Sequence, residues 1–363
     1  MIDSLSLLSV IILLPFVGML FALSSKEDEN GGGHNAFNVA LFSVGANLVL
    51  ILRVFYNLDL QKNGLQLIER FNWLENPNID IIFGADIFSV VTIMAVHIAF
   101  IIGFVWPFIW GIYLSFCKFT TVQDVTFVGF SNYSKILLDS TFSHSFWLTV
   151  VFAFVSSILI NVLAFFIALA LTKGYRGTNA FRTVFFMPNL IGGIVLGYIW
   201  QTLLNGLLSK WGQPLLSLSA KNGFIGMLIL LMWQQIGYMM IIYIAGLNNV
   251  SPDLIEAAQI DGATSRQILF KIKIPMIMPS VTICTFLTLT NGFKMFDQNL
   301  SLTGGDPGKQ SQLLALNIYD TFYARSGPQW KGIGQAKAVV FFVLVVVIAL
   351  IQLRATSSKE VQQ

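Results

Sequence analysis

Eight long apolar runs constrain this chain more than any other feature of its sequence. They cover approximately residues 5–23, 37–56, 88–116, 146–171, 183–204, 223–247, 276–296 and 339–353. A helix needs about 20 apolar residues to cross a bilayer, and the chain is 55% hydrophobic with only 11% charged residues. The sequence therefore predicts an all-α fold, a polytopic transmembrane helical bundle of about eight spans in the cell membrane.

Other broad classes of protein fit poorly. The net charge is +3 and no basic run is present, so nucleic acid is not an expected partner. Cys117 and Cys284 are far apart, and the three histidines lack ligand spacing, so neither a disulfide framework nor a metal or other cofactor is expected. The first apolar run has the length of a span and Asp3 in place of a basic start, which favours a retained helix over a signal peptide.

A short water-compatible stretch, Glu256–Pro275, interrupts the apolar pattern. Ser251 is a good helix cap, and Pro252 suits the first position of a helix. Gly262 permits a turn about two helical turns later, and Pro275 is expected to end the second short helix. From spacing alone the stretch is either a simple connector between two spans or a surface that a partner receives in a cleft.

The residues of this stretch resemble the EAA loop of ATP-binding-cassette importer permeases. The match consists of Glu256-Ala257-Ala258, Gly262, Ile272 and Pro275, with Ile274 at the usual leucine position. In that family the loop is cytoplasmic and docks into a cleft of the ATPase subunit. The resemblance implies that the docking residues are Glu256, Ala257, Ala258, Asp261, Gly262, Ile272 and Pro275.

The resemblance extends over about residues 98–353, to the sugar-importer branch of these permeases. It rests on Trp106–Phe116, Phe127–Tyr133, Arg182–Pro188 and Leu302–Gly308. It implies a permease domain over 91–363 with about six core spans. It also implies a second permease subunit, more often a different one, two ABC ATPase subunits, and an extracytoplasmic solute-binding protein that delivers an oligosaccharide or a glycerol phosphate.

The chain itself is not expected to be an enzyme. The glycine-rich stretch Gly304–Gln310 lacks the spacing of a phosphate-binding loop, because Thr303 stands at the first glycine position and Gln310 follows Lys309. We interpret the stretch as an extracytoplasmic turn. ATP hydrolysis is therefore expected in a partner subunit.

Basic residues give the orientation. They cluster in three connections that the span count places on one side, namely Lys173, Arg176 and Arg182; Arg266, Lys271 and Lys273; and Arg354 and Lys359. Positive charge favours the cytoplasmic side of membrane proteins. The EAA loop and the C-terminus are therefore expected in the cytoplasm.

Residues 1–90 do not fit the importer family. Residues 65–74 and 83–89 resemble the N-terminal region of chain M of the proton-pumping NADH:quinone oxidoreductase, although Ala85-Asp86-Ile87 departs from its usual pattern. Residues 58–86 are expected to form short strands or an interfacial segment, and no pumping residue is carried over. Residues 1–90 are therefore expected to be a two-span N-terminal extension that resembles another protein family. Two alternatives remain for the whole chain, a membrane subunit of a proton-pumping oxidoreductase or a non-functional fusion.

Polar residues within two spans are the candidate solute path. They are Trp233, Gln234, Gln235 and Tyr238 in one span, and Asn291 and Lys294 near the end of another. Aromatic faces and amides suit a sugar, which offers apolar C–H patches between hydroxyl groups. The alternative is that the amides only tie helices together, since polar groups inside a membrane commonly bond across helices.

Overall fold

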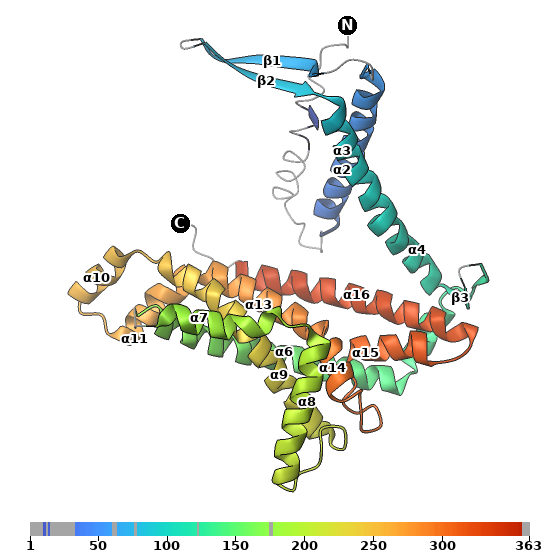
Figure 1. Ribbon diagram of the computed structural model, residues 1–363, viewed down its shortest axis with the longest axis vertical. Helices are drawn as coiled ribbons and strands as arrows, with labels where there is room; N and C mark the ends of the chain where they lie inside the picture. The colour runs from blue at the N-terminus through green and yellow to red at the C-terminus, as the bar shows by residue number, and fades with distance from the viewer. Residues whose placement is uncertain are drawn as a thin grey trace. The chain divides into compact units, whose positions relative to one another are not determined.

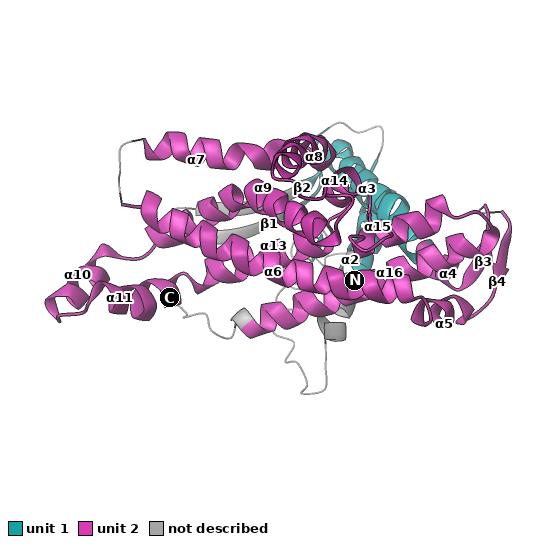
Figure 2. Ribbon diagram, turned by 90° about the horizontal axis from the view of Figure 1, so that it is seen from below, with its two compact units in different colours: residues 1–110 teal, residues 111–363 magenta. Residues whose placement is uncertain are grey.

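The computed structural model describes residues 10, 11, 14, 33–59, 64–75, 78–121, 123–173 and 177–357. The chain forms two compact units, residues 1–110 and 111–363 (Figure 2). Their division falls inside helix α4 (Trp106–Ser115), later than the predicted domain boundary at residue 90. The boundary at residue 90 was placed where the resemblance changes from the oxidoreductase chain to the importer permeases, and it stays a prediction. The predicted first span, residues 5–23, lies outside the described residues except for 10, 11 and 14.

The first unit holds a helix, a hairpin and the beginning of a long helix. Helix α2 (Gly33–Asn57) is followed by the antiparallel strands β1 (Gln66–Glu75) and β2 (Asn78–Ala85), which confirms short strands within residues 58–86. Asp86 then caps helix α3 (Ile87–Phe100), because its carboxylate accepts the Ser89 N–H at 2.6 Å.

The second unit is almost entirely helical, which confirms the predicted fold class (Figure 1). After α4 come the paired strands β3 (Cys117–Phe119) and β4 (Val125–Phe127). The elements that follow are α5 (Ser131–Leu137), α6 (Ser140–Leu171), α7 (Thr178–Phe186), the 3₁₀ turn η2 (Met187–Leu190), α8 (Gly193–Lys210), α9 (Ala220–Asn248), α10 (Pro252–Ile260), α11 (Ser265–Ile268), the π turn η3 (Leu269–Lys273), α12 (Ile274–Met276), α13 (Met278–Phe293), α14 (Asp297–Leu302), α15 (Leu314–Tyr319), the π turn η4 (Asp320–Ala324) and α16 (Pro328–Ser357).

Four helices of the described chain are long and apolar enough to cross a membrane: Ile87–Ser115, Ser140–Leu171, Ala220–Asn248 and Pro328–Ala355. Two bent pairs bring the count to six if each pair is one span. The predicted continuous span over 183–204 is wrong, since α7 with η2 meets α8 at 104°. Pro188 in the 3₁₀ turn and the glycines Gly192 and Gly193 explain this break. The total of eight spans stays a prediction.

The second bent pair corrects the expected role of Pro275. The helix does not end there: α12 continues to Met276, and the 70° bend with α13 falls at Ile277. A π turn, Leu269–Lys273, directly precedes the proline segment, and the π turn η1 (Ile101–Val105) likewise precedes Pro107. A proline lacks the N–H that an α-helix needs, so a locally widened turn accommodates each of these residues.

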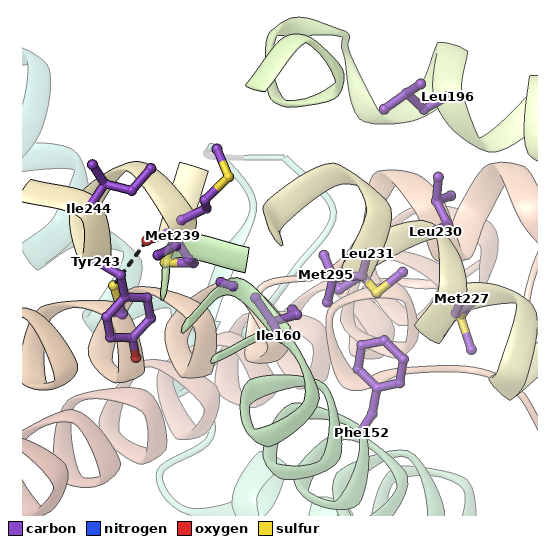
Figure 3. Close-up of a cluster of buried hydrophobic side chains, with 14 of the residues drawn as sticks. Phe152, Ile160, Leu196, Met227, Leu230, Leu231, Met239, Tyr243, Ile244 and Met295 are labelled. Atoms are coloured by element: carbon purple, nitrogen blue, oxygen red, sulfur yellow. Dashed lines mark hydrogen bonds between the residues drawn. The ribbon is translucent and has the colours of Figure 1, made fainter. Parts of the chain in front are cut away.

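The core of the second unit lies where α6 packs against α9 and α13. Figure 3 shows its buried side chains, among them Phe152 and Ile160 of α6 and Met227 of α9. Close backbone approach supports this packing: a Cβ atom on Gly292 of α13 would lie 2.8 Å from the Ala153 Cα of α6. Small residues at such crossings are typical of membrane helices, whose association depends on close van der Waals contact.

The connections rich in basic residues gather at one end of the second unit. Figures 1 and 2 place α10, α11 and the start of α7 at this end, and α16 runs toward it, while β3, β4 and α5 lie at the opposite end. The start of α7, helix α11 and the last part of α16 therefore lie toward one end of the unit. The predicted Arg176 and Lys359 lie outside the described residues.

Candidate functional site

The predicted solute-path residues of α9 lie beside the break between η2 and α8. Gly237 makes this approach possible, because a Cβ atom there would collide with the backbone carbonyl of Phe185. On the other side of the break, Gly197 of α8 packs against the Ser301 side chain of α14. The middle of α9 therefore lies beside an interrupted helix pair, an arrangement that transporters use to expose backbone and side-chain polar groups inside a membrane.

Gln234 ties this break together. Its Nε2 donates to the Ile191 carbonyl at 3.3 Å, and its Oε1 accepts from Gln298 Nε2 of α14 at 2.7 Å. Ile191 directly follows η2, where the interrupted helix leaves carbonyl groups without helical partners. Gln234 is buried, and both ends of its amide bond to protein. These two bonds fit the helix-tying alternative for Gln234.

Gln235 and Asn291 form a second amide pair with spare hydrogen-bonding capacity. Asn291 Nδ2 of α13 donates to Gln235 Oε1 at 3.0 Å, and both side chains are half-buried. Within the described chain, Gln235 Nε2 and Asn291 Oδ1 have no protein partner. A donor and an acceptor therefore lie side by side, which matches the needs of a hydroxyl group.

The aromatic members of the set lie at the edges of this region. The Trp233 ring contacts Trp200 of α8 with a centroid distance of 5.3 Å, and Tyr238 contacts Phe186 at 6.4 Å. Lys294 is exposed at the end of α13 and forms no ion pair within the described chain. The structure thus brings Gln234, Gln235 and Asn291 together and leaves Lys294 outside their network.

The EAA stretch forms a helix–turn–helix built around Gly262. Gly262 has a φ of +78°, and it follows α10 in a Schellman motif: the Gly262 N–H donates to Gln259 O at 3.0 Å and the Ala263 N–H to Ala258 O at 2.9 Å. The predicted interruption at Gly262 is confirmed. Ser251 occupies the predicted N-cap position of α10, but its side chain makes no capping bond, whereas Thr264 and Gln267 form a capping box for α11.

This helix–turn–helix exposes both the predicted docking residues and apolar side chains that the sequence analysis missed. Glu256, Ala257, Asp261 and Gly262 are exposed, and Ala258, Ile272 and Pro275 are half-buried. Leu254, Ile260 and Phe270 are also exposed, Ile260 to 86%. A hollow of about 360 Å³, lined in part by Asp261 and Lys271, lies beside the turn. Large apolar residues on a polar segment indicate a surface that a partner covers.

Interrupted spans around a polar crossing, together with an exposed helix–turn–helix, define a polytopic membrane protein of the transporter class. The chain belongs to the family described as "Binding-protein-dependent transport system inner membrane component", whose model matches residues 160–357. The predicted importer-permease resemblance is therefore confirmed, and the chain is a multi-pass inner-membrane protein.

Individual relatives agree with this assignment. The chain is 41% identical over 264 residues to the "Probable starch degradation products transport system permease protein AmyD" of Thermoanaerobacterium thermosulfurigenes, covering 70% of this chain and 89% of the relative. It is 30% identical to the "Trehalose/maltose transport system permease protein MalF" of Thermococcus litoralis, covering 65% and 81%. A chain from the crystal structure of a bacterial ABC transporter that imports alginate shares the fold, with a TM-score of 0.64 at 19% identity, covering 75% of this chain and 95% of that chain.

Proposed function

We propose that this chain is the membrane-spanning permease subunit of an ATP-binding-cassette importer for a carbohydrate. The observation that carries the proposal is the exposed helix–turn–helix around Gly262, in a chain of this family. Relatives named for starch degradation products and for trehalose and maltose support the carbohydrate class. The chain supplies the path, and a separate ATPase subunit supplies the energy.

The ATPase docks on the helix–turn–helix in this proposal. Glu256, Ala257, Ala258, Asp261, Gly262, Ile272 and Pro275 form the contact, together with the exposed Leu254, Ile260 and Phe270. Because α10 follows α9 directly and α12 precedes α13, a pull on this segment acts on the two helices that carry Gln235 and Asn291. ATPase closure thereby changes the side of the membrane to which the solute path opens.

The solute contacts the second amide pair. Gln235 Nε2 and Asn291 Oδ1 offer one donor and one acceptor to neighbouring hydroxyl groups, while Trp233 and Tyr238 offer partly exposed aromatic faces. Gln234 keeps the helix break in place, and Lys294 lies at the rim of the path.

The partners and the orientation follow from the same proposal. Two ATPase subunits, a second and different permease subunit, and an extracytoplasmic solute-binding protein complete the importer. A solved alginate transporter bound to a periplasmic protein supports the last of these partners. The basic connections predicted around α7, α11 and the end of α16, which lie toward one end of the second unit, support a cytoplasmic helix–turn–helix and C-terminus.

Residues 1–90 are proposed to be an extension of foreign origin, similar to the start of oxidoreductase chain M. Of the curated relatives described above, neither accounts for more than 70% of the chain. A truncated protein of residues 98–363 tests this proposal. It retains ATPase binding and transport if the extension is dispensable, and it loses both if the extension is part of the permease.

Co-purification with an importer ATPase tests the docking proposal. The intact chain is expected to bind the ATPase in detergent, and Glu256→Arg is expected to abolish binding while the protein still inserts in the membrane. Lys221→Glu, a charge reversal at the start of α9, is the control and keeps binding. Equal binding by the intact chain and Glu256→Arg would remove the helix–turn–helix from the interface.

A further inference from the structure

An aromatic hollow lies in the second unit, apart from Gln235 and Asn291. Its volume is about 390 Å³, within the ~300–1,000 Å³ range of small-molecule sites. Its lining includes Phe296, Tyr319, Phe322, Tyr323, Gly334 and Gln335. These residues come from η4, from α15 and α16, and from the segment before α14.

The rings of this hollow form a continuous aromatic surface. The centroid distances are 5.1 Å between Phe296 and Tyr319, 5.0 Å between Tyr319 and Tyr323, and 4.8 Å between Phe322 and Tyr323. Tyr319 is 41% exposed and Tyr323 69% exposed. The rings therefore contact one another and still present open faces.

Close packing of η4 against α16 fixes the floor of the hollow. A Cβ atom on Gly334 would lie 2.9 Å from the Phe322 Cβ, so only glycine permits this approach. The neighbouring Gln335 side chain is held against α4, because a Cβ atom on Gly111 would lie 2.7 Å from its Nε2. The helix packing thus fixes the positions of the aromatic rings and of the Gln335 amide.

Three polar groups of the hollow have no hydrogen-bond partner within the described chain. They are the hydroxyl groups of Tyr319 and Tyr323 and the half-buried side-chain amide of Gln335. Unpaired polar groups are costly against lipid chains or an apolar helix. Open aromatic faces combined with free donors and acceptors suit a sugar ring, which has C–H patches and hydroxyl groups together.

We infer that this hollow is a second carbohydrate subsite, in which a ring of an oligosaccharide stacks on Tyr319 and Tyr323 and bonds to Gln335. The inference rests on the proposed function. Short helix α14 connects the two regions, since Gln298 within it bonds to Gln234 and Phe296 just before it contacts Tyr319. A longer oligosaccharide engages both regions, whereas a disaccharide at Gln235 and Asn291 leaves the hollow empty.

The test measures ATP-driven uptake of maltose and maltohexaose by the complete importer in proteoliposomes. Tyr319→Ala and Tyr323→Ala are expected to raise the half-saturating concentration of maltohexaose about ten-fold and to leave that of maltose nearly unchanged. Tyr323→Phe retains the ring and is expected to lose less than Tyr323→Ala. Tyr198→Ala, which removes an exposed tyrosine of α8, is the matched control and changes neither sugar.

The alternative outcomes separate the two proposals. If the unaltered importer transports both sugars and the tyrosine variants match it, the subsite is excluded and the proposed function stands. If Tyr323→Ala releases the second permease subunit during purification, the hollow is a subunit contact and the subsite is excluded. If the unaltered importer transports neither these sugars nor any other oligosaccharide tried, the proposed carbohydrate function itself fails.

Discussion

The Lys337 ammonium lies 2.8 Å from Asp139 Oδ2, and the lysine side chain is completely buried. The pair joins α16 to the N-terminus of α6, where the other oxygen of Asp139 accepts the backbone N–H groups of Thr141 and Phe142. Asn317 Oδ1 at 2.8 Å and Thr321 Oγ1 at 3.0 Å also accept from Lys337. One buried cation thus holds α6, α15, η4 and α16 together.

Removing this cation leaves Asp139 without its partner. Lys337→Met is expected to destabilise the second unit by about 3–5 kcal/mol, the cost of breaking a buried pair. Thermal unfolding of the full chain in detergent measures the change. Lys309→Met, which breaks the exposed Lys309–Asp320 pair, is the control and is expected to cost at most ~1 kcal/mol. Similar melting temperatures for the two variants would contradict the assigned role of Lys337.

Acid is expected to weaken the same contact. Burial alone would raise the pKa of Asp139, but the hydrogen bond and positive charge of Lys337, together with the backbone N–H groups of Phe142 and Thr141, hold that pKa below its ordinary value of 3.8. A carboxyl group with a lowered folded-state pKa stabilises the protein above its unfolded pKa and loses this effect as the pH falls through the folded value.

The melting temperature should therefore decrease as the pH is lowered below about 4. Asp139→Asn retains the oxygen that caps α6 and removes the titration, so its melting temperature should fall less over the same acidic range. Parallel pH profiles for the two proteins would show that Asp139 does not contribute.

The sequence predicted those features that depend on local patterns. Apolar length located the four helices long enough to cross a membrane, and Gly262 located the turn that its φ of +78° requires. The pairing of Lys337 with Asp139 was not predicted, because the two residues are 198 positions apart and only helix packing joins them. The hollow of Tyr319 and Tyr323 was missed because its lining comes from Phe296, α15, η4 and α16, which only helix packing brings together.

The helix breaks were predicted only in part. Proline within an apolar run predicts a bent helix, and Pro188 and Pro279 both lie at bends. The 104° angle at η2 was not expected, because apolar composition reports the length of a span and not its path. The break becomes stable through Gln234, whose partners Ile191 and Gln298 come from distant segments.

Gly262→Ala separates backbone strain from contact with the ATPase. An alanine at this φ costs about 1–2 kcal/mol, although nothing lies within 4 Å of the new Cβ atom. The variant is therefore expected to fold and to bind the ATPase more weakly in a pull-down. Gly308→Ala has a similar φ of +54° and equally open space, and it should keep full ATPase binding. Equal loss in both variants would indicate general destabilisation.

Gly237→Ala tests the close approach of α7 to α9. A Cβ atom at this position collides with the Phe185 carbonyl, so the helix break must shift and the melting temperature should fall. Gly206→Ala in α8 is the control, because its Cβ atom meets nothing within 4 Å and alanine favours a helix by up to ~1 kcal/mol. A Gly237→Ala protein as stable as the Gly206→Ala protein would contradict the packing of α7 on α9.

The stability of the protein is expected to depend on Gln234 and much less on the neighbouring Gln235. Gln234→Ala leaves the Ile191 carbonyl and Gln298 unpaired, at a cost of about 1–3 kcal/mol for buried groups, and should lower the melting temperature. Gln235→Ala removes the half-buried amide that has a free donor, so stability should change little.

For the protein that remains folded, transport is expected to depend on Gln235 more than on Gln234. Gln235→Ala should raise the half-saturating sugar concentration about ten-fold, whereas folded Gln234→Ala should keep a value near that of the unaltered protein. Asn291→Ala should resemble Gln235→Ala, because the two amides act as one pair. If Gln235→Ala and Asn291→Ala lower only the melting temperature, both amides serve as ties between α9 and α13, and the solute must bind elsewhere.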